Sequence, residues 1–191
     1  MLPRGRAAGA LRWGRPGARL DGMATLLLVR HAKAANRDEW RGADRDRPLV
    51  KRGRAQAARL ANALGDGDGA SDGDGGPALV AASPWLRCVQ TAEPMAATAG
   101  LEVVEDARLG YDEPDFRAWV IEALAVHPER DLVAVSHGDL IPWFLDDTGL
   151  LAGFGRFRTG SLYRVEIVGG RLRAPAVYVD RDDLPELDTG G

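Results

Sequence analysis

The chain has 191 residues, of which 45% are hydrophobic and 28% charged, a balance that fits one packed domain and excludes a disordered or fibrous chain. No apolar run approaches the roughly 18 residues that a membrane span requires, and the single cysteine, Cys88, excludes an internal disulfide and a cysteine-based zinc site. The net charge of −3 argues against a nucleic-acid-binding domain.

Residues 1–22 form a basic leader that is expected to lie outside the folded domain, which we place at residues 23–191. The leader holds five arginines and one aspartate, a charge of +4, so the remainder carries −7 of the total of −3. Its arginines interrupt every apolar run, so it lacks the core of a secretory signal, and its prolines and glycines disfavour a helical transit peptide. We expect Met23 to be the working start; a disordered basic tail and a targeting segment are the alternatives. The expected location is the cytoplasm.

From residue 23 onward, short apolar runs alternate with segments of helical period. Near-continuous apolar runs predict strands at residues 25–29, 78–82, 101–105 and 131–135. Apolar residues at helical spacing predict helices at residues 52–64, 84–99, 115–126 and 140–148. Pro84 suits the first turn of the second helix, which Pro94 is expected to kink or divide.

Two further strands, at residues 161–168 and 172–179, flank Gly169-Gly170, which is a hairpin signal. Four strand–helix units followed by a hairpin predict an α/β three-layer sandwich, in which helices cover both faces of a central sheet. The sheet is expected to be mostly parallel with an antiparallel edge.

Residues 65–77 form a loop rich in glycine and aspartate that could be taken for a calcium site. The glutamate that closes an EF-hand loop is missing, and no helices of the right kind flank the segment. We therefore expect a flexible, hydrated linker rather than a calcium site at its four aspartates, Asp66, Asp68, Asp72 and Asp74.

Histidines and arginines follow three of the predicted strands, at the points where these strands end. Arg30 and His31 end the first strand, Arg87 lies one helical turn beyond the second, and His137 follows the fourth. Because ligands of open α/β sheets bind beyond the carboxyl ends of the strands, we expect these side chains to converge.

This set of side chains suits the chemistry of a phosphoryl group. Arginine offers a planar, permanently charged fork of donors that matches phosphate oxygens. A neutral histidine can attack phosphorus through a ring nitrogen and form a covalent phosphohistidine, while a second histidine stabilises the oxygens of the group in transfer. No metal ion or other cofactor is required.

The motifs around these residues resemble those of the histidine phosphatase superfamily, also called phosphoglycerate mutase-like. The matching segments are LLLVRHAKA (26–34), DRPL (46–49) with Arg52-Gly53, SPWLRCVQTAEP (83–94) and VSHGDLI (135–141). RHAKA followed by D-R-P-L-x-x-R-G is similar to the short, SixA-type branch and to the phosphatase domain fused to Nudix hydrolases, although this chain contains no Nudix motif. The resemblance implies the phosphoglycerate mutase-like fold.

The resemblance also implies roles for individual residues. His31 would be the nucleophile, Arg30 and Arg87 the two phosphate clamps, and His137 the second histidine that contacts phosphate. The proton donor stays open between Asp112 and Glu113, which lie just beyond the place where mutase-type members carry an acid, and no donor at all, as is common in the short branch. Lys33, Asn36 and Arg47 lie in loops where they could touch substrate, and Trp85 could line the rim of the pocket.

The predicted function is hydrolysis of a phosphoryl group through a covalent phosphohistidine, with phosphohistidine proteins as the expected substrates. Nucleotides or small phosphate esters are the alternative substrates, and a catalytically inactive phosphate-binding domain is the alternative function. The partners are thus a phosphorylated protein or a small phosphorylated molecule, with no nucleic acid and no membrane.

The pattern H-x-K-x₄-D, formed by His31, Lys33 and Asp38, also fits phospholipase D-type phosphodiesterases, but that chemistry needs a second copy, which the chain lacks. His127, at a predicted helix end, and Cys88 are expected to be structural.

Overall fold

The computed structural model describes residues 23–65, 76–153 and 155–184. The predictions about the leader and about the aspartates of the glycine-rich loop concern residues outside these ranges.

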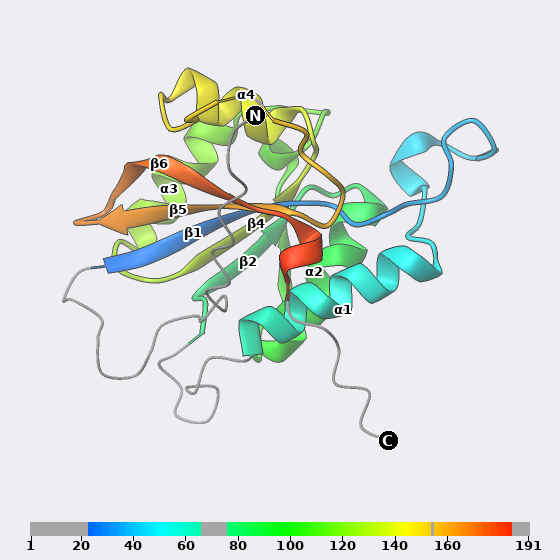
Figure 1. Ribbon diagram of the computed structural model, residues 1–191, viewed down its shortest axis with the longest axis horizontal. Coiled ribbons are helices and arrows are strands. Elements are labelled where there is room, and N and C mark those ends of the chain that lie inside the picture. Colours follow the sequence, from blue (N-terminus) through cyan, green and yellow to red (C-terminus); the bar gives the residue numbers. More distant parts are fainter. Residues whose placement is uncertain (1–22, 66–75, 154, 185–191) are drawn as a thin grey trace, which may run out of the picture.

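A six-stranded sheet forms the centre of the molecule, with the strand order β3-β2-β4-β1-β5-β6 (Figure 1). The strands are β1 (Met23–Arg30), β2 (Leu79–Ala82), β3 (Val103–Glu105), β4 (Leu132–Ser136), β5 (Leu162–Val168) and β6 (Arg171–Val179). The first four strands pair in parallel, whereas β5 pairs antiparallel with β1 and with β6. The prediction of a mostly parallel sheet with an antiparallel edge is confirmed. The β5–β6 turn uses Gly169 and Gly170, whose φ angles of 56° and 69° suit the twist of a two-residue hairpin.

Helices cover both faces of this sheet (Figure 1). On one face lie α1 (Lys51–Gly65) and α2 (Leu86–Thr98), and on the other α3 (Phe116–Val126) and α4 (Leu140–Asp147). Strand β1 is apolar at successive positions because each of its faces meets a separate core: Leu27 packs in the core of α1 and α2, and Leu28 in that of α3 and α4. The predicted three-layer α/β sandwich is confirmed.

Helix α2 is continuous through Pro94, so of the two predicted effects of this proline, a kink or a division, the division does not occur. Proline removes one backbone hydrogen bond, but the turn that contains it is anchored by Met95 and Ala96, which are buried in the core. The backbone nitrogen of Ala99 donates hydrogen bonds to the carbonyl oxygens of Met95 and Ala96 at the end of the helix. Burial of this apolar face therefore outweighs the missing donor.

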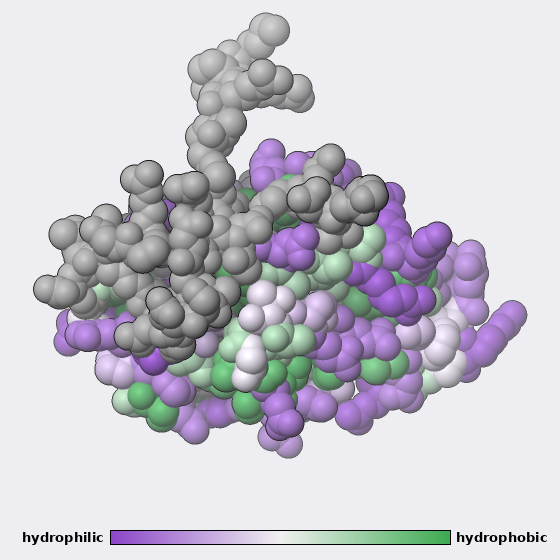
Figure 2. Space-filling model, turned by 90° about the horizontal axis from the view of Figure 1, so that it is seen from below, coloured by the Kyte–Doolittle hydropathy of each residue, from purple (hydrophilic) through white to green (hydrophobic). Residues whose placement is uncertain are grey.

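The face that carries α1 and α2 is seen from outside in Figure 2, where hydrophilic residues predominate and apolar ones appear between them. Within the part of the chain that the structure describes, no helix is both long and apolar enough to cross a membrane.

The register of the sheet aligns the carboxyl ends of β1, β2 and β4 side by side. Arg30, the last residue of β1, pairs with Ser136, the last residue of β4, and Ala82 at the end of β2 pairs with Val135. The alignment continues just beyond the strands, where the backbone nitrogen of His31 donates a hydrogen bond to the carbonyl oxygen of Ser136 and that of Ser83 to the carbonyl oxygen of Val135. The residues that follow β1, β2 and β4 are therefore neighbours in space, as predicted.

Candidate active site

His31 lies directly beyond β1 and is 9% exposed. Its Nδ1 is 2.8 Å from the carbonyl oxygen of Ala32, which can only accept a hydrogen bond, so Nδ1 carries the proton. Its Nε2 accepts a hydrogen bond from Nε of Arg87 at 3.2 Å. Both contacts fix the same neutral tautomer, with the unprotonated Nε2 facing an arginine. Burial, together with the charges of Arg87 and Arg30, holds the pKa of His31 well below 6.5.

Arg87, in the first turn of α2, is the central cation of the site and is only 3% exposed. Beyond His31, it donates through Nη1 to the carbonyl oxygen of Asp44 at 2.9 Å and through Nη2 to Nδ1 of His137 at 3.5 Å. Its guanidinium group lies 4.5 Å from the centre of the Trp85 ring. Arg87 therefore connects the two histidines and holds a fixed position between them.

His137 follows β4 and is completely buried. Since its Nδ1 accepts from Arg87, its Nε2 carries the proton and donates to Oγ of Ser83 at 3.0 Å. Burial and the neighbouring charge of Arg87 lower its pKa to about 3. The His31 and His137 rings stand edge to face with 5.7 Å between their centres, so two neutral imidazoles share the floor of the site.

Arg30 reaches the site from the end of β1 and donates to the carbonyl oxygen of Phe157. It passes directly over Gly138: a Cβ atom at that position would lie 2.5 Å from the guanidinium carbon. The glycine of the Ser136-His137-Gly138 segment is thus required for the close approach of this arginine.

The segment Ser83–Thr91 attaches helix α2 to the site at three points. Ser83 binds His137 and Arg87 binds His31, as described above. One turn further, Oγ1 of Thr91 accepts from the backbone nitrogen of Ala32 at 3.0 Å and donates to the carbonyl oxygen of Arg87 at 2.6 Å. Thr91 therefore fixes the backbone next to His31, which explains the spacing of the S-P-x-x-R-x-x-x-T pattern.

The loop after His31 is held by the start of α1. The carbonyl oxygen of Lys33 accepts from the backbone nitrogen of Val50, and the Lys33 backbone nitrogen donates to Oε1 of Gln56. A Cβ atom at Gly53 would lie only 2.0 Å from that Lys33 oxygen. Arg47 donates to the carbonyl oxygen of Ala35 at 2.6 Å. The D-R-P-L-x-x-R-G segment is therefore the support of the loop that carries the predicted nucleophile.

Asp44 is a residue of the site that the sequence did not reveal. It begins the short 3₁₀ helix η1 (Asp44–Asp46), and its carboxylate lies 2.7 Å from Nε of Arg47 and 3.6 Å from Nη2 of Arg87. Although partial burial raises its pKa, the bond from Arg47 and the charge of Arg87 bring the net shift downward. Charges of both signs are balanced in this loop, so only the spacing of Asp44 before Arg47 could have singled it out.

The two candidate proton donors from the sequence do not line the cleft. Asp112 accepts a hydrogen bond from Nε1 of Trp85 at 3.0 Å, and Glu113 is exposed. Their neighbour Tyr111 lies over His137, with 4.2 Å between ring centres, and its hydroxyl donates to Oδ1 of Asp139 at 2.6 Å. Tyr111 and Asp139 are the groups that this segment and the start of α4 present to the cleft.

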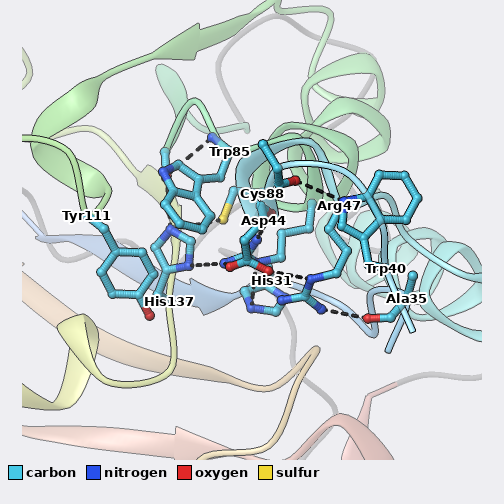
Figure 3. Close-up of polar contacts among 12 residues, drawn as sticks. His31, Ala35, Trp40, Asp44, Arg47, Trp85, Cys88, Tyr111 and His137 are labelled. Carbon is cyan, nitrogen blue, oxygen red and sulfur yellow. Dashed lines mark hydrogen bonds and ion pairs between the residues drawn. The ribbon is translucent and has the colours of Figure 1, made fainter. Parts of the chain in front are cut away.

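These side chains surround an open cleft of about 730 Å³, with His31 between an aromatic side and a loop side (Figure 3). Trp85 and Tyr111 form the aromatic side, and Figure 3 shows Ala35, Trp40 and Arg47 of the loop on the other side. The lining residues are Arg30, His31, Lys33, Ala34, Arg37, Asp44, Arg47, Trp85, Arg87, Tyr111, Gly138, Asp139 and Thr159. His137 lies beneath Tyr111, so the structure brings together all four residues of the predicted phosphate pocket.

Other residues singled out in the sequence fall inside and outside this cleft. Lys33 and Arg47 line it, whereas Asn36 is exposed and bonds to Glu39, and Asp38 of the phosphodiesterase pattern is exposed. His127 ends α3, where its backbone nitrogen bonds to Ala123, as expected of a structural residue.

Cys88 is fully buried, and its Sγ lies 3.8 Å from Nε2 of His137. Burial raises the pKa of its thiol to about 12, so it is a packing residue, as predicted. Among the described residues, no group of three or more His, Cys, Asp or Glu side chains is arranged to hold a metal ion.

Comparison with known proteins agrees with this geometry. Residues 26–119 match the sequence model of the histidine phosphatase superfamily (branch 1). The fold is similar to that of a protein histidine phosphatase SixA solved with tungstate, with a TM-score of 0.61, 21% identity and coverage of 82% of this chain and 94% of that one. It is also similar to YhfR of Bacillus stearothermophilus, with a TM-score of 0.60, 19% identity and coverage of 83% and 98%.

A curated relative, an 8-oxo-(d)GTP phosphatase of Mycolicibacterium smegmatis (strain ATCC 700084 / mc(2)155), is 46% identical over 72 residues. The match covers 38% of this chain but only a fifth of that relative's length. The sheet order, the paired histidines and these similarities define an α/β protein of the phosphoglycerate mutase-like class. Within it, residues 26–119 carry the sequence pattern of the histidine phosphatase superfamily (branch 1).

Proposed function

We propose that the chain is a phosphatase that works through a covalent phosphohistidine at His31. In the first step Nε2 of His31 forms a bond to phosphorus while the bond to the leaving group breaks. In the second step water attacks phosphorus, inorganic phosphate leaves and Nε2 is regenerated. The observation that carries the proposal is the fixed tautomer of His31, whose unprotonated Nε2 lies in the cleft beside Arg87.

The charges around His31 support this chemistry. Arg30 and Arg87 are held rigidly by Gly138, Phe157 and Asp44, so little reorganisation is needed when a phosphoryl group enters. His137 is neutral in the empty site, and the negative charge of a bound phosphoryl group would raise its pKa. Once protonated, His137 would add a positive charge close to that group.

The surroundings of the leaving group favour substrates that need little help from an acid. Of the two carboxylates that line the cleft, Asp44 is paired with Arg47, and Asp139 accepts bonds from Tyr111 and from the Leu140 backbone. Both carboxylates are thus already engaged with other groups of the protein. An imidazole leaves phosphorus more readily than an alkoxide does. We therefore propose phosphohistidine in a protein as the substrate.

A nucleotide is the second candidate substrate, and a phosphoanhydride would meet the same requirement for a good leaving group. The curated relative is an 8-oxo-(d)GTP phosphatase. The aromatic side of the cleft also suits a planar ring, because Trp85 and Tyr111 stand together there with 5.0 Å between ring centres.

Turnover of p-nitrophenyl phosphate and of a phosphohistidine peptide tests the proposal. The wild-type protein should hydrolyse both, and His31→Ala should lose at least about 10³-fold in kcat/KM, because no other group can form the covalent bond. His127→Ala is the matched control, since this histidine lies at the end of α3 outside the cleft. Binding of phosphate without turnover by the wild type would show an inactive phosphate-binding domain instead.

A further inference from the structure

The cleft carries more positive charge than one phosphoryl group requires. Among the residues that the structure describes, seven charged ones line it, five cations and two carboxylates: Arg30, Lys33, Arg37, Arg47, Arg87, Asp44 and Asp139. Arg30 and Arg87 belong to the pocket at His31, and Arg47 is paired with Asp44 and with the carbonyl oxygen of Ala35. Two cations that line the cleft, Lys33 and Arg37, are thus left without a role in the proposed reaction.

Neither Lys33 nor Arg37 forms an ion pair or a side-chain hydrogen bond with another residue that the structure describes. Both side chains are exposed to the cleft, and the nearby carboxylate of Asp44 is already bound to Arg47 and lies 3.6 Å from Arg87. The Lys33 backbone is fixed at both its nitrogen and its carbonyl oxygen by α1 and the residue before it. The backbone at Lys33 is therefore held in place, while the two cationic side chains remain available to a ligand.

The position of these cations limits which anion they can meet. Lys33 lies two residues beyond His31, so their backbones are at most about 7 Å apart. Both cations belong to the loop that follows His31 and line the same cleft as His31. An anion that reached them would thus lie in the same cleft as the phosphoryl group in transfer and close to it.

We propose that Lys33 and Arg37 form a subsite for a second phosphoryl group linked directly to the one that is transferred, so that diphosphates bind more tightly than monophosphates. The inference rests on the proposed phosphatase activity and concerns its second class of substrate, the phosphoanhydrides. The bridging oxygen leaves with the second phosphoryl group as phosphorus bonds to His31. Lys33 and Arg37 stabilise the charge that collects there.

Non-hydrolysable inhibitors test the subsite without depending on the leaving group. Methylenediphosphonate should inhibit hydrolysis of p-nitrophenyl phosphate about 10- to 100-fold more strongly than methylphosphonate does, as expected for added charge-assisted hydrogen bonds. This preference should nearly vanish in Lys33→Ala/Arg37→Ala. It should persist in Arg41→Ala/Arg45→Ala, which removes two exposed cations of the same loop that do not line the cleft.

Turnover provides a second readout. In Lys33→Ala/Arg37→Ala, kcat/KM for a nucleoside diphosphate should fall about 10-fold or more relative to that for p-nitrophenyl phosphate, mainly through KM. Equal inhibition by the two phosphonates in the wild type, or an unchanged preference in the double variant, would overturn the subsite. If phosphonoacetate inhibits as strongly as methylenediphosphonate, the assignment of the subsite to a second phosphoryl group is wrong. That result would point instead to an acidic side chain of a protein substrate.

The proposal of the subsite and the proposed function can be refuted independently of each other. If the wild type does not hydrolyse p-nitrophenyl phosphate, the proposed function fails, and calorimetric affinities for the same two phosphonates still decide the subsite. If hydrolysis is normal but the phosphonate preference is absent, the subsite alone is refuted.

Discussion

His31 and His137 are both kept neutral by burial beside Arg87, and this neutrality has two consequences. An unprotonated Nε2 is the form of His31 that can attack phosphorus, so the site is ready to react without first losing a proton. The same burial makes the folded protein sensitive to acid, because both imidazoles gain a proton more easily in the unfolded chain.

The free energy of unfolding should therefore depend on pH in a defined window. The pKa values of both histidines are lower in the folded protein than the unfolded value near 6.5, so the unfolded state binds more protons below that pH. Stability should be nearly constant between about pH 7 and 8 and fall below pH 6.5, by on the order of 1.4 kcal/mol per pH unit for each histidine. Urea denaturation between pH 4.5 and 7.5 measures this slope, which should be shallower in His137→Gln. An equal slope in that variant would contradict the assignment to His137.

Thr91 acts through the backbone beside His31 rather than by touching substrate. Thr91→Val leaves the Ala32 nitrogen without its partner, which should cost about 1–3 kcal/mol of stability and about 10-fold in kcat for p-nitrophenyl phosphate. Thr98→Val is the control, because this exposed threonine makes a hydrogen bond of the same type to Pro94 near the end of the same helix. Equal losses in the two variants would show that Thr91 has no special role at the site.

Among the elements, α1 and α2 hold the loop and the side chains that meet at His31. At Gly53 the packing is so close that a Cβ atom would clash with the Lys33 carbonyl oxygen, because the start of α1 touches that oxygen. This contact links the position of a helix to that of the predicted nucleophile.

Gly53→Ala should displace the start of α1 from this loop. Alanine improves helix propensity by about 1 kcal/mol, but the clash with a backbone oxygen is expected to outweigh this, giving a net loss of about 1–3 kcal/mol and a lower kcat/KM. Gly76→Ala serves as the control, since a Cβ atom there meets nothing within 4 Å. Thermal unfolding and phosphatase assays give the two readouts. A Gly53→Ala protein as stable and active as the wild type would refute the close contact.

The strands and helices could be predicted because their patterns are local. The apolar run at the start of the domain indicates a strand covered on both faces, and the structure places Leu27 and Leu28 in opposite cores. Pro94 does not divide α2, because the backbone hydrogen bond that proline removes is outweighed by burial of the neighbouring residues in the core. The convergence of the four residues of the predicted phosphate pocket could be predicted because each lies at or shortly beyond the end of a strand, in a recognisable motif.

Asp44, Tyr111 and Asp139 were missed as site residues because their local sequence, apart from the spacing of Asp44 before Arg47, does not indicate where they fold. Asp44 reaches Arg87 only through the path of a loop, and the Tyr111–Asp139 hydrogen bond joins two segments 28 residues apart. Such contacts depend on tertiary structure rather than on spacing along the chain.

At the scale of the whole molecule, residues 23–191 carry a charge of −7, yet five of the seven charged residues known to line the cleft are cations. Among the residues that the structure describes, those that line the cleft fall within residues 30–159. We propose that residues 23–191 are the functional domain. A chain that begins at Met23 should keep the stability and kcat/KM of the full chain, measured by thermal unfolding and by p-nitrophenyl phosphate hydrolysis. Loss of either would assign a role to residues 1–22.

The covalent intermediate is the central claim, and trapping it is the most direct test. The protein is mixed with a substrate whose phosphoryl group is radiolabelled and is denatured in alkali, since phosphohistidine survives base and is lost in acid. The account predicts label on the peptide that contains His31, released by acid and absent from His31→Ala. Label on another residue, or hydrolysis undiminished in His31→Ala, would contradict it.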